Sequence, residues 1–107
     1  MQLLFKAYAC EKVDEDGKLL LPGYPARPDM RRLQPGERIH VELADGTFLQ
    51  TMLVKTEVMT FSESAQSKFL RAAPGIYWAV KVPIGFDAPG IELGAKVFVD
   101  DSPTSVA

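Results

Sequence analysis

The 107-residue chain has the length of one ordinary domain, and such a chain buries enough apolar surface to fold without a disulfide or a metal. A formal net charge of -2 and a sequence pI of about 5.3 disfavour nucleic acid as a partner, because phosphate contacts call for a positive surplus. We expect a single domain over residues 1–100 and a flexible tail over residues 101–107.

The sequence contains no signal for export or membrane insertion. Residues 1–8 hold a short apolar run that Lys6 interrupts, without the basic start or the cleavage site of a signal peptide. No apolar stretch reaches the roughly 18 residues of a membrane-spanning helix. Cys10 is the only cysteine, which excludes an intrachain disulfide and suits a reducing compartment. We therefore expect a cytoplasmic protein that contacts no membrane and needs no cofactor.

Short apolar runs between frequent turns predict a mainly β fold. The acidic turn Asp14–Gly17 separates the apolar residues 3–13 from residues 18–21, which predicts a first hairpin. Four Pro-Gly pairs mark further tight reversals: Pro22-Gly23, Pro35-Gly36, Pro74-Gly75 and Pro89-Gly90. This pattern is typical of a sandwich or barrel. We expect a small closed antiparallel β-barrel of about six strands with one short helix.

The clearest local unit is a second hairpin between Glu37 and Val58. Apolar and polar residues alternate over residues 38–43, which is the period of a half-buried strand, and Asp45-Gly46 is a strong hairpin signal. If Asp45 and Gly46 form the whole loop, Leu43 lies opposite Phe48. The returning strand is then expected to place Phe48, Met52, Val54 and Val58 on the apolar side, with Ile39, Val41 and Leu43.

One segment departs from the β pattern. Thr60 and Glu63 have the spacing of a capping box, and residues 63–72 suit a short helix that ends before Pro74. An irregular barrel connection is the alternative.

The last strands are predicted at residues 76–83 and 95–100, which are rich in β-branched and aromatic residues and are expected to pair. Alternation directs Tyr77 and Phe98 outward if both strands are regular. Exposed aromatic side chains are typical of a partner interface, so we expect a protein partner or a second copy of the chain at this edge.

The run Leu33–Leu43 places a Pro-Gly turn before a strand, and residues 72–76 and 91–97 supply later Gly-containing segments before apolar strands. With these features, residues 33–99 resemble the β-barrel domains of translational GTPases such as elongation factor Tu. The resemblance implies a barrel that binds a GTPase domain, tRNA or an exchange factor. No Gly-x-x-x-x-Gly-Lys-Ser/Thr phosphate loop is present, so no GTPase activity is implied.

Four of the five arginines fall in one proline-containing stretch, namely Arg27, Arg31, Arg32 and Arg38. Guanidinium groups bind phosphate and carboxylate through paired hydrogen bonds, so this loop is a candidate binding surface for RNA or an acidic protein. The alternative is a solvated loop in which Asp29 and Glu37 neutralise part of the charge.

The residues that usually carry catalysis are sparse. His40 is the only histidine and is expected to point outward from its strand, with no nucleophile beside it in the sequence. Cys10 is either a nucleophile activated by nearby lysines or, as we expect, a half-buried hydrophobe. No zinc spacing is present. We therefore predict no catalytic residue and no metal ligand.

These observations favour a small non-enzymatic binding module for protein or RNA. The alternative is a small-ligand-binding protein or a small enzyme, with a pocket at the barrel mouth that residues 84–94 help to line. In that case Asp87, Glu92 or His40 would be brought together.

Overall fold

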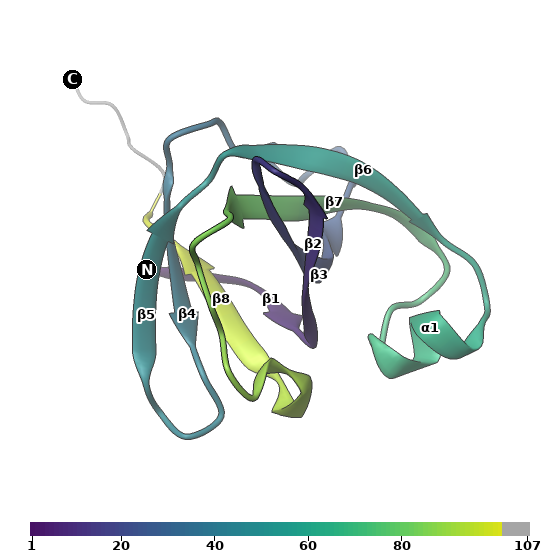
Figure 1. The fold of residues 1–107 in the computed structure, drawn as a ribbon. Coiled ribbons are helices and arrows are strands. Elements are labelled where there is room, and N and C mark those ends of the chain that lie inside the picture. Colours follow the sequence, from purple (N-terminus) through teal and green to yellow (C-terminus); the bar gives the residue numbers. More distant parts are fainter. Residues whose placement is uncertain (102–107) are drawn as a thin grey trace.

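The computed structural model describes residues 1–101 (Figure 1). The predicted tail therefore lies outside the described residues, except for Asp101. The described chain is mainly β, as predicted, and contains eight strands, one short α-helix and a single 3-10 turn, in the order β1 (Gln2–Ala7), β2 (Ala9–Asp14), β3 (Gly17–Pro25), β4 (Arg38–Glu42), β5 (Phe48–Met52), β6 (Lys55–Phe61), α1 (Ala65–Phe69), β7 (Gly75–Pro83), η1 (Ile91–Leu93) and β8 (Ala95–Val99).

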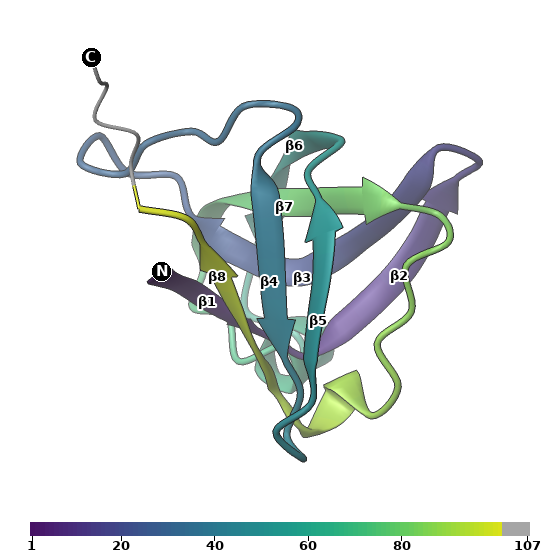
Figure 2. The same cartoon turned by 90° about the vertical axis from the view of Figure 1, so that its left-hand side faces the viewer.

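The strands form two antiparallel four-stranded sheets. The first sheet has the order β1-β8-β4-β5 and the second has the order β2-β3-β7-β6, and neither is closed on itself. In Figure 2 the strands β4 and β5 run across the direction of β7 behind them. The chain passes from the first sheet to the second at two bends. Tyr8 N donates to Leu21 O at 2.8 Å at the first bend, and Val54 N donates to Lys81 O at 2.8 Å at the second.

The main core lies between the two sheets and is almost wholly aliphatic. Its buried side chains come from both sheets and from the loops that join them, and include Phe5, Ala7, Leu20, Tyr24, Leu33, Ile39, Val41, Leu53, Val80, Val82, Val97 and Val99. A smaller cluster packs on the other face of the second sheet, next to α1, and consists of Leu19, Leu21, Phe61, Leu70, Ala72 and Ala79. The second sheet is therefore covered on both faces over part of its area, whereas the first sheet buries one face.

The predicted pairing of residues 76–83 with residues 95–100 is wrong. β7 pairs with β3 and β6 in the second sheet, and β8 pairs with β1 and β4 in the first. The connection between them, with buried Ala88 and Ile91, carries the chain from one sheet to the other. The composition of the two segments identifies them as strands, but it contains no information about which strand each one adjoins.

The β4–β5 hairpin exists, but its register differs from the prediction by one residue. Glu42 lies opposite Phe48, because Gly46 N donates to Leu43 O and Leu43 N donates to Thr47 O, each at 2.9 Å. This is a three-residue loop with Gly46 at φ +90°, and not a two-residue loop. A slip of one residue reverses the two faces of a strand, so Phe48 and Met52 are exposed.

The helix is shorter than predicted and has a different cap. Thr60 belongs to β6, so it is not available to cap a helix. Ser64 and Ser67 cap α1 instead, since Ser67 N donates to Ser64 Oγ at 3.2 Å and Ser64 N donates to Ser67 Oγ at 2.9 Å. Arg71, at φ 56°, ends the helical segment.

Gly23 lies at an irregularity of the β3–β7 pairing, between the paired positions Leu20 and Tyr24. Its φ is +92°, and a Cβ at this position would collide with the carbonyl oxygen of Trp78 and with Ala79 Cα. Gly36 has the same φ of +92°, but a Cβ there would meet nothing within 4 Å. Alanine substitutions at the two positions therefore separate the free-energy cost of the positive φ from the cost of the steric collision.

We predict that Gly36→Ala lowers the free energy of unfolding by about 1 kcal/mol, which is the ordinary cost of a left-handed alanine. Gly23→Ala is expected to cost at least about 3 kcal/mol, because β3 must move away from β7. Urea unfolding of both variants checks this, and equal losses would contradict the close packing at Gly23.

Candidate functional site

The loop of residues 26–37, which connects β3 to β4 and carries three of the candidate arginines, is held by a buried tyrosine. Tyr24 has no exposed surface, and its ring packs edge-to-face against Trp78 with the ring centroids 5.4 Å apart. Its hydroxyl accepts a hydrogen bond from Leu33 N at 3.0 Å and donates to Arg31 O at 3.2 Å. One phenol thereby satisfies two backbone groups of the loop and fixes its path over the core.

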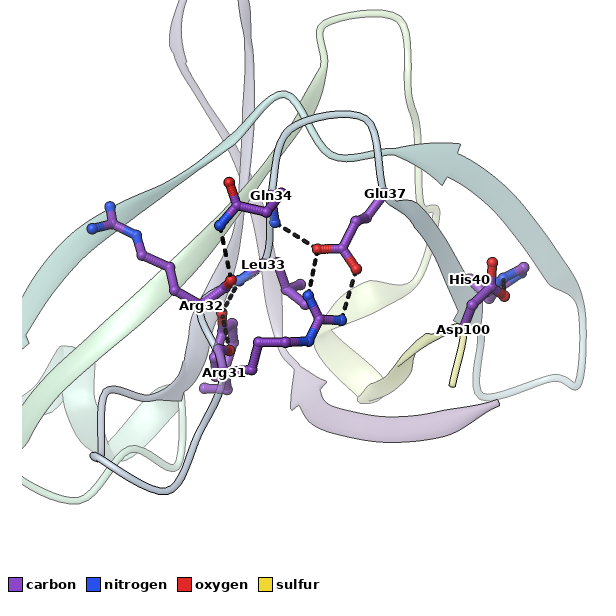
Figure 3. A network of polar contacts seen from close by, with 8 residues as sticks. Arg31, Arg32, Leu33, Gln34, Glu37, His40 and Asp100 are labelled. Carbon is purple, nitrogen blue, oxygen red and sulfur yellow. Dashed lines mark hydrogen bonds and ion pairs between the residues drawn. The ribbon is translucent and has the colours of Figure 1, made fainter. Parts of the chain in front are cut away.

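Arg31 is used within the loop. Its guanidinium forms a two-fold pair with the Glu37 carboxylate, with nitrogen–oxygen distances of 2.7 and 2.8 Å, and Gln34 N also donates to that carboxylate (Figure 3). The hydrogen bonds from Arg31 lower the pKa of Glu37, and those to Glu37 raise the pKa of Arg31. Both groups are therefore charged at neutral pH and neutralise each other.

Arg32 connects the loop to the second sheet. Its Nε donates to Thr56 Oγ1 at 2.7 Å, and its guanidinium carbon lies 5.7 Å from the centre of the Trp78 ring. This combination of a hydrogen bond and a cation–π contact holds the side chain on β6 and β7.

All four candidate arginines are exposed, but the remaining two, Arg27 and Arg38, donate no side-chain hydrogen bond within residues 1–101. Arg27 Nε is 3.8 Å from Asp29 Oδ1, and the residue borders a hollow of about 430 Å³ that Ile76 and Tyr77 also line. Arg38 begins β4 and makes no ion pair within residues 1–101. Two of the four predicted arginines, Arg31 and Arg32, are therefore engaged in contacts that hold the loop, whereas Arg27 and Arg38 are not.

The two predicted aromatic residues lie on different sheets, because β7 and β8 do not pair. Tyr77 is half-buried beside α1, where its hydroxyl donates to Ala73 O at 3.0 Å and its ring meets the Phe61 ring edge-on at 5.3 Å. Phe98 lies on the outer face of the first sheet, opposite Leu3 on β1. Tyr77 and Phe98 therefore cannot form one continuous edge.

Phe98 belongs instead to a larger apolar surface on the outer side of the first sheet. Its ring stacks on Phe48 with centroids 6.2 Å apart and an interplanar angle of 28°. Leu3, Phe48 and Met52 are 54 %, 53 % and 55 % exposed. We call these four residues, Leu3, Phe48, Met52 and Phe98, the aromatic face. The sequence pattern missed Phe48 and Met52 because the hairpin register was predicted one residue away.

His40 lies between Phe98 and Gln50 on the same outer side. Its Nε2 is 2.8 Å from Asp100 Oδ1. This contact joins β4 to the end of β8, and the sequence did not indicate it because the two residues are far apart in the chain. His40 has no hydrogen bond or ion pair to Asp87 or Glu92 within the described residues, so the grouping required for a catalytic site is not formed.

A buried lysine was not anticipated from the sequence. Lys81 is only 2 % exposed, and its Nζ lies 2.6 Å from Asp14 Oδ2 and 3.8 Å from Glu57 Oε2. The hydrogen bond to Asp14 raises the pKa of Lys81 and, reciprocally, lowers the pKa of Asp14. Asp14 also accepts hydrogen bonds from Asp16 N and Gly17 N, so the lysine joins the β2–β3 turn to β7. A lysine in a strand normally indicates a solvent-facing position, so the sequence did not indicate that Lys81 is buried and ion-paired.

The surroundings of Cys10 disfavour a reactive thiol. Cys10 is half-buried against the main core, and burial raises the pKa of its thiol, which disfavours the reactive thiolate at neutral pH. No group of three or more His, Cys, Asp or Glu residues within residues 1–101 is placed to hold a metal ion.

Comparison of the chain with protein-family models, with curated proteins and with solved structures gave no match. No helix in the described part of the chain is long and apolar enough to cross a membrane.

Tyr24→Phe is expected to lower the free energy of unfolding by about 1–3 kcal/mol, because Leu33 N and Arg31 O lose their partner inside the protein. Tyr8→Phe is the matched control, since the Tyr8 hydroxyl bonds to no described residue. Chemical denaturation of both variants measures the difference, and equal stabilities would show that the Tyr24 hydroxyl does not hold the loop.

Glu37→Gln is expected to destabilise the protein by about 1 kcal/mol at neutral pH, because solvent screens the partly exposed Arg31. The pKa of Glu37 is lowered by folding, so its contribution is present above the ordinary carboxyl range and is lost as the pH falls through the lowered value. The stability gap between Glu37→Gln and the unchanged protein should therefore close in acid. Thermal unfolding across the acid range, with Glu63→Gln as control, tests this; a gap independent of pH would contradict it.

Proposed function

We propose that the protein is a non-enzymatic binding module that recognises another protein through the aromatic face. The observation that carries this proposal is a group of neighbouring apolar side chains on a sheet face that no other layer within residues 1–101 covers: Leu3 lies opposite Phe98, and Phe98 stacks on Phe48. Exposed apolar side chains that gather in one patch are typical of interaction surfaces, whereas single exposed ones are not.

The surroundings of the aromatic face support a protein as the partner. Lys96 and Glu42 lie opposite each other on the same outer side, and His40 pairs with Asp100. An apolar centre with charged neighbours of both signs is the usual composition of a protein interface. A nucleic acid is a less suitable partner, because the chain is acidic overall and both Arg31 and Arg32 already bind other groups of the protein.

The architecture that we propose for this module is a six-stranded barrel, in which β1–β2 and β5–β6 each count as one bent strand. The bends at Tyr8 and Val54 support this view, because each bend residue bonds to the next strand of the second sheet. The resemblance of residues 33–99 to the barrels of translational GTPases, and a cytoplasmic location, are parts of the same proposal.

A second candidate function is the binding of a small anion. A hollow of about 280 Å³ lies at one end of the first sheet, and Lys6 and Lys96 face each other across β1 and β8 at its wall. Two like charges at directly opposed positions repel each other, which an anion between them would relieve. Glu42 lines the same hollow and weakens this attraction, so we rank this function second.

The test is affinity capture of the tagged chain from a lysate of its source organism, with and without nuclease. Phe98→Ser and Leu3→Ser are expected to lose a stoichiometric protein partner that survives nuclease treatment. Val58→Ser is the matched control for Leu3→Ser, because Val58 is 58 % exposed, close to the 54 % of Leu3, but lies on the second sheet. Retention of the partner by both aromatic-face variants would refute the proposal, and loss of the partner on nuclease treatment would favour RNA.

A further inference from the structure

The edge of the first sheet at β5 carries unused backbone hydrogen-bonding groups. Leu43 N donates to Thr47 O, and Leu53 N donates to Glu37 O. These two bonds show which residue pairs of the antiparallel β4–β5 ladder are hydrogen-bonded, since such pairs alternate with non-hydrogen-bonded ones. Leu49 and Thr51 therefore direct their N–H and C=O groups toward β4. The backbone groups of the other β5 residues, Phe48, Gln50 and Met52, point away from β4 and meet no protein partner within residues 1–101. Figure 2 shows β4 along only one side of β5.

β5 differs from the other three edge strands in having no protection against pairing. β1 contains Lys6, β2 contains Glu11, Lys12 and Asp14, and β6 contains Lys55 and Glu57. Arg32 additionally covers part of the β6 edge through its contact with Thr56 O at 3.4 Å. β5 contains no charged residue and no proline. Charges and prolines are the usual means of blocking edge-to-edge association.

From this we propose that β5 pairs with β5 of a second copy of the chain in an antiparallel, two-fold symmetric arrangement centred on Gln50. In this register Gln50 lies opposite Gln50 of the second copy, and Phe48 lies opposite Met52 of the second copy. About six backbone hydrogen bonds then join the two sheets into one. The inference concerns the edge of the sheet, and it does not depend on the proposed function of its face.

The side chains and charges around β5 suit this pairing. Phe48 and Met52 are both exposed on the outer side, so the symmetric register places an aromatic ring against a thioether at each end. Asp45 precedes β5 and Lys55 follows it, and both are exposed. The antiparallel arrangement places Asp45 of one copy at the same end of the paired strands as Lys55 of the other, which follows the bend into β6, whereas a parallel arrangement would place like charges at the same end.

The pairing is expected to be weak. A single five-residue strand contributes a smaller contact than a standard protein interface, which implies a dissociation constant in the micromolar range. Phe48 and Met52 contact the second copy in this arrangement, whereas Leu3 and Phe98 of each copy stay exposed, so the dimer would bring the two aromatic faces side by side.

The test uses sedimentation of the full chain from about 1 to about 500 μM, a range that spans the expected dissociation constant. Gln50→Lys and Gln50→Glu are each expected to weaken the dimer at least about tenfold, because each variant places two like charges opposite each other at the two-fold axis. An equimolar mixture of the two variants should recover a heterodimer. Thr60→Lys on the exposed part of β6 is the control and should leave the association unchanged.

A monomer over the whole concentration range would overturn the inference, as would a dimer that Gln50→Lys does not weaken or a mixture that forms no heterodimer. Hydrogen exchange on the unchanged chain gives an independent result. The amides of Gln50 and Met52 should become protected as concentration rises, whereas those of Leu49 and Thr51 should be protected throughout. Exchange at Gln50 that does not depend on concentration would count against the pairing.

The proposed function has a separate readout. Phe98→Ser should lose the captured partner and keep the dimer, since Phe98 lies on β8 and not at the edge. Gln50→Lys should lose the dimer and keep the captured partner.

Discussion

The course of the loop from β3 to β4 depends on one buried hydroxyl group. Tyr24 places its ring in the core and its hydroxyl beneath residues 31–33, where it bonds to one N–H and one C=O group. A loop that carries polar backbone over a core must satisfy those groups, and in this chain a side chain does so. Once Arg31 and Leu33 are fixed, the Arg31–Glu37 pair closes the loop and sets where β4 begins. The three-residue loop after β4 then determines the register of β5, and through it which side chains are exposed.

The two sheets differ in what covers their outer sides. On the second sheet, the cluster next to α1 and the Lys81–Asp14 pair occupy the outer side. On the first sheet, β4 and β8 direct their aliphatic residues into the main core, and Phe48 and Phe98 remain on the uncovered side. Antiparallel sheets ordinarily avoid the cost of exposing apolar side chains by placing polar residues on the solvent-facing side. This asymmetry is why both proposals concern the first sheet, one its face and the other its edge.

Local turn chemistry was enough to predict much of the fold, whereas register and partner choice were not. The Asp14–Gly17 turn was confirmed because aspartate and glycine have direct local roles there. The Asp45-Gly46 signal located a hairpin correctly, but it fits loops of two and of three residues, and the choice between them reverses the faces of β5. The pairing of β7 and β8 was wrong because strand composition does not specify a neighbour.

The candidate site residues show the same contrast between what local sequence indicates and what depends on long-range contacts. The sequence located the arginines, yet which of them hold the loop depends on Tyr24, Glu37 and Thr56, and Thr56 is distant in the chain. Phe98 was correctly placed on an outer side, but its neighbour Phe48 was predicted to be buried. Long-range contacts of this kind leave no trace in the local periodicity of a single sequence.

The arrangement around Trp78 has a practical consequence. Trp78 is the only tryptophan in the chain, and its ring contacts both the Tyr24 ring and the Arg32 guanidinium. Its indole emission therefore comes from one place, at the contact between the loop of residues 26–37 and the second sheet. Because this place is remote from Phe98 in the sheet order, the protein contains a built-in optical reporter of loop order that is separate from events on the first sheet.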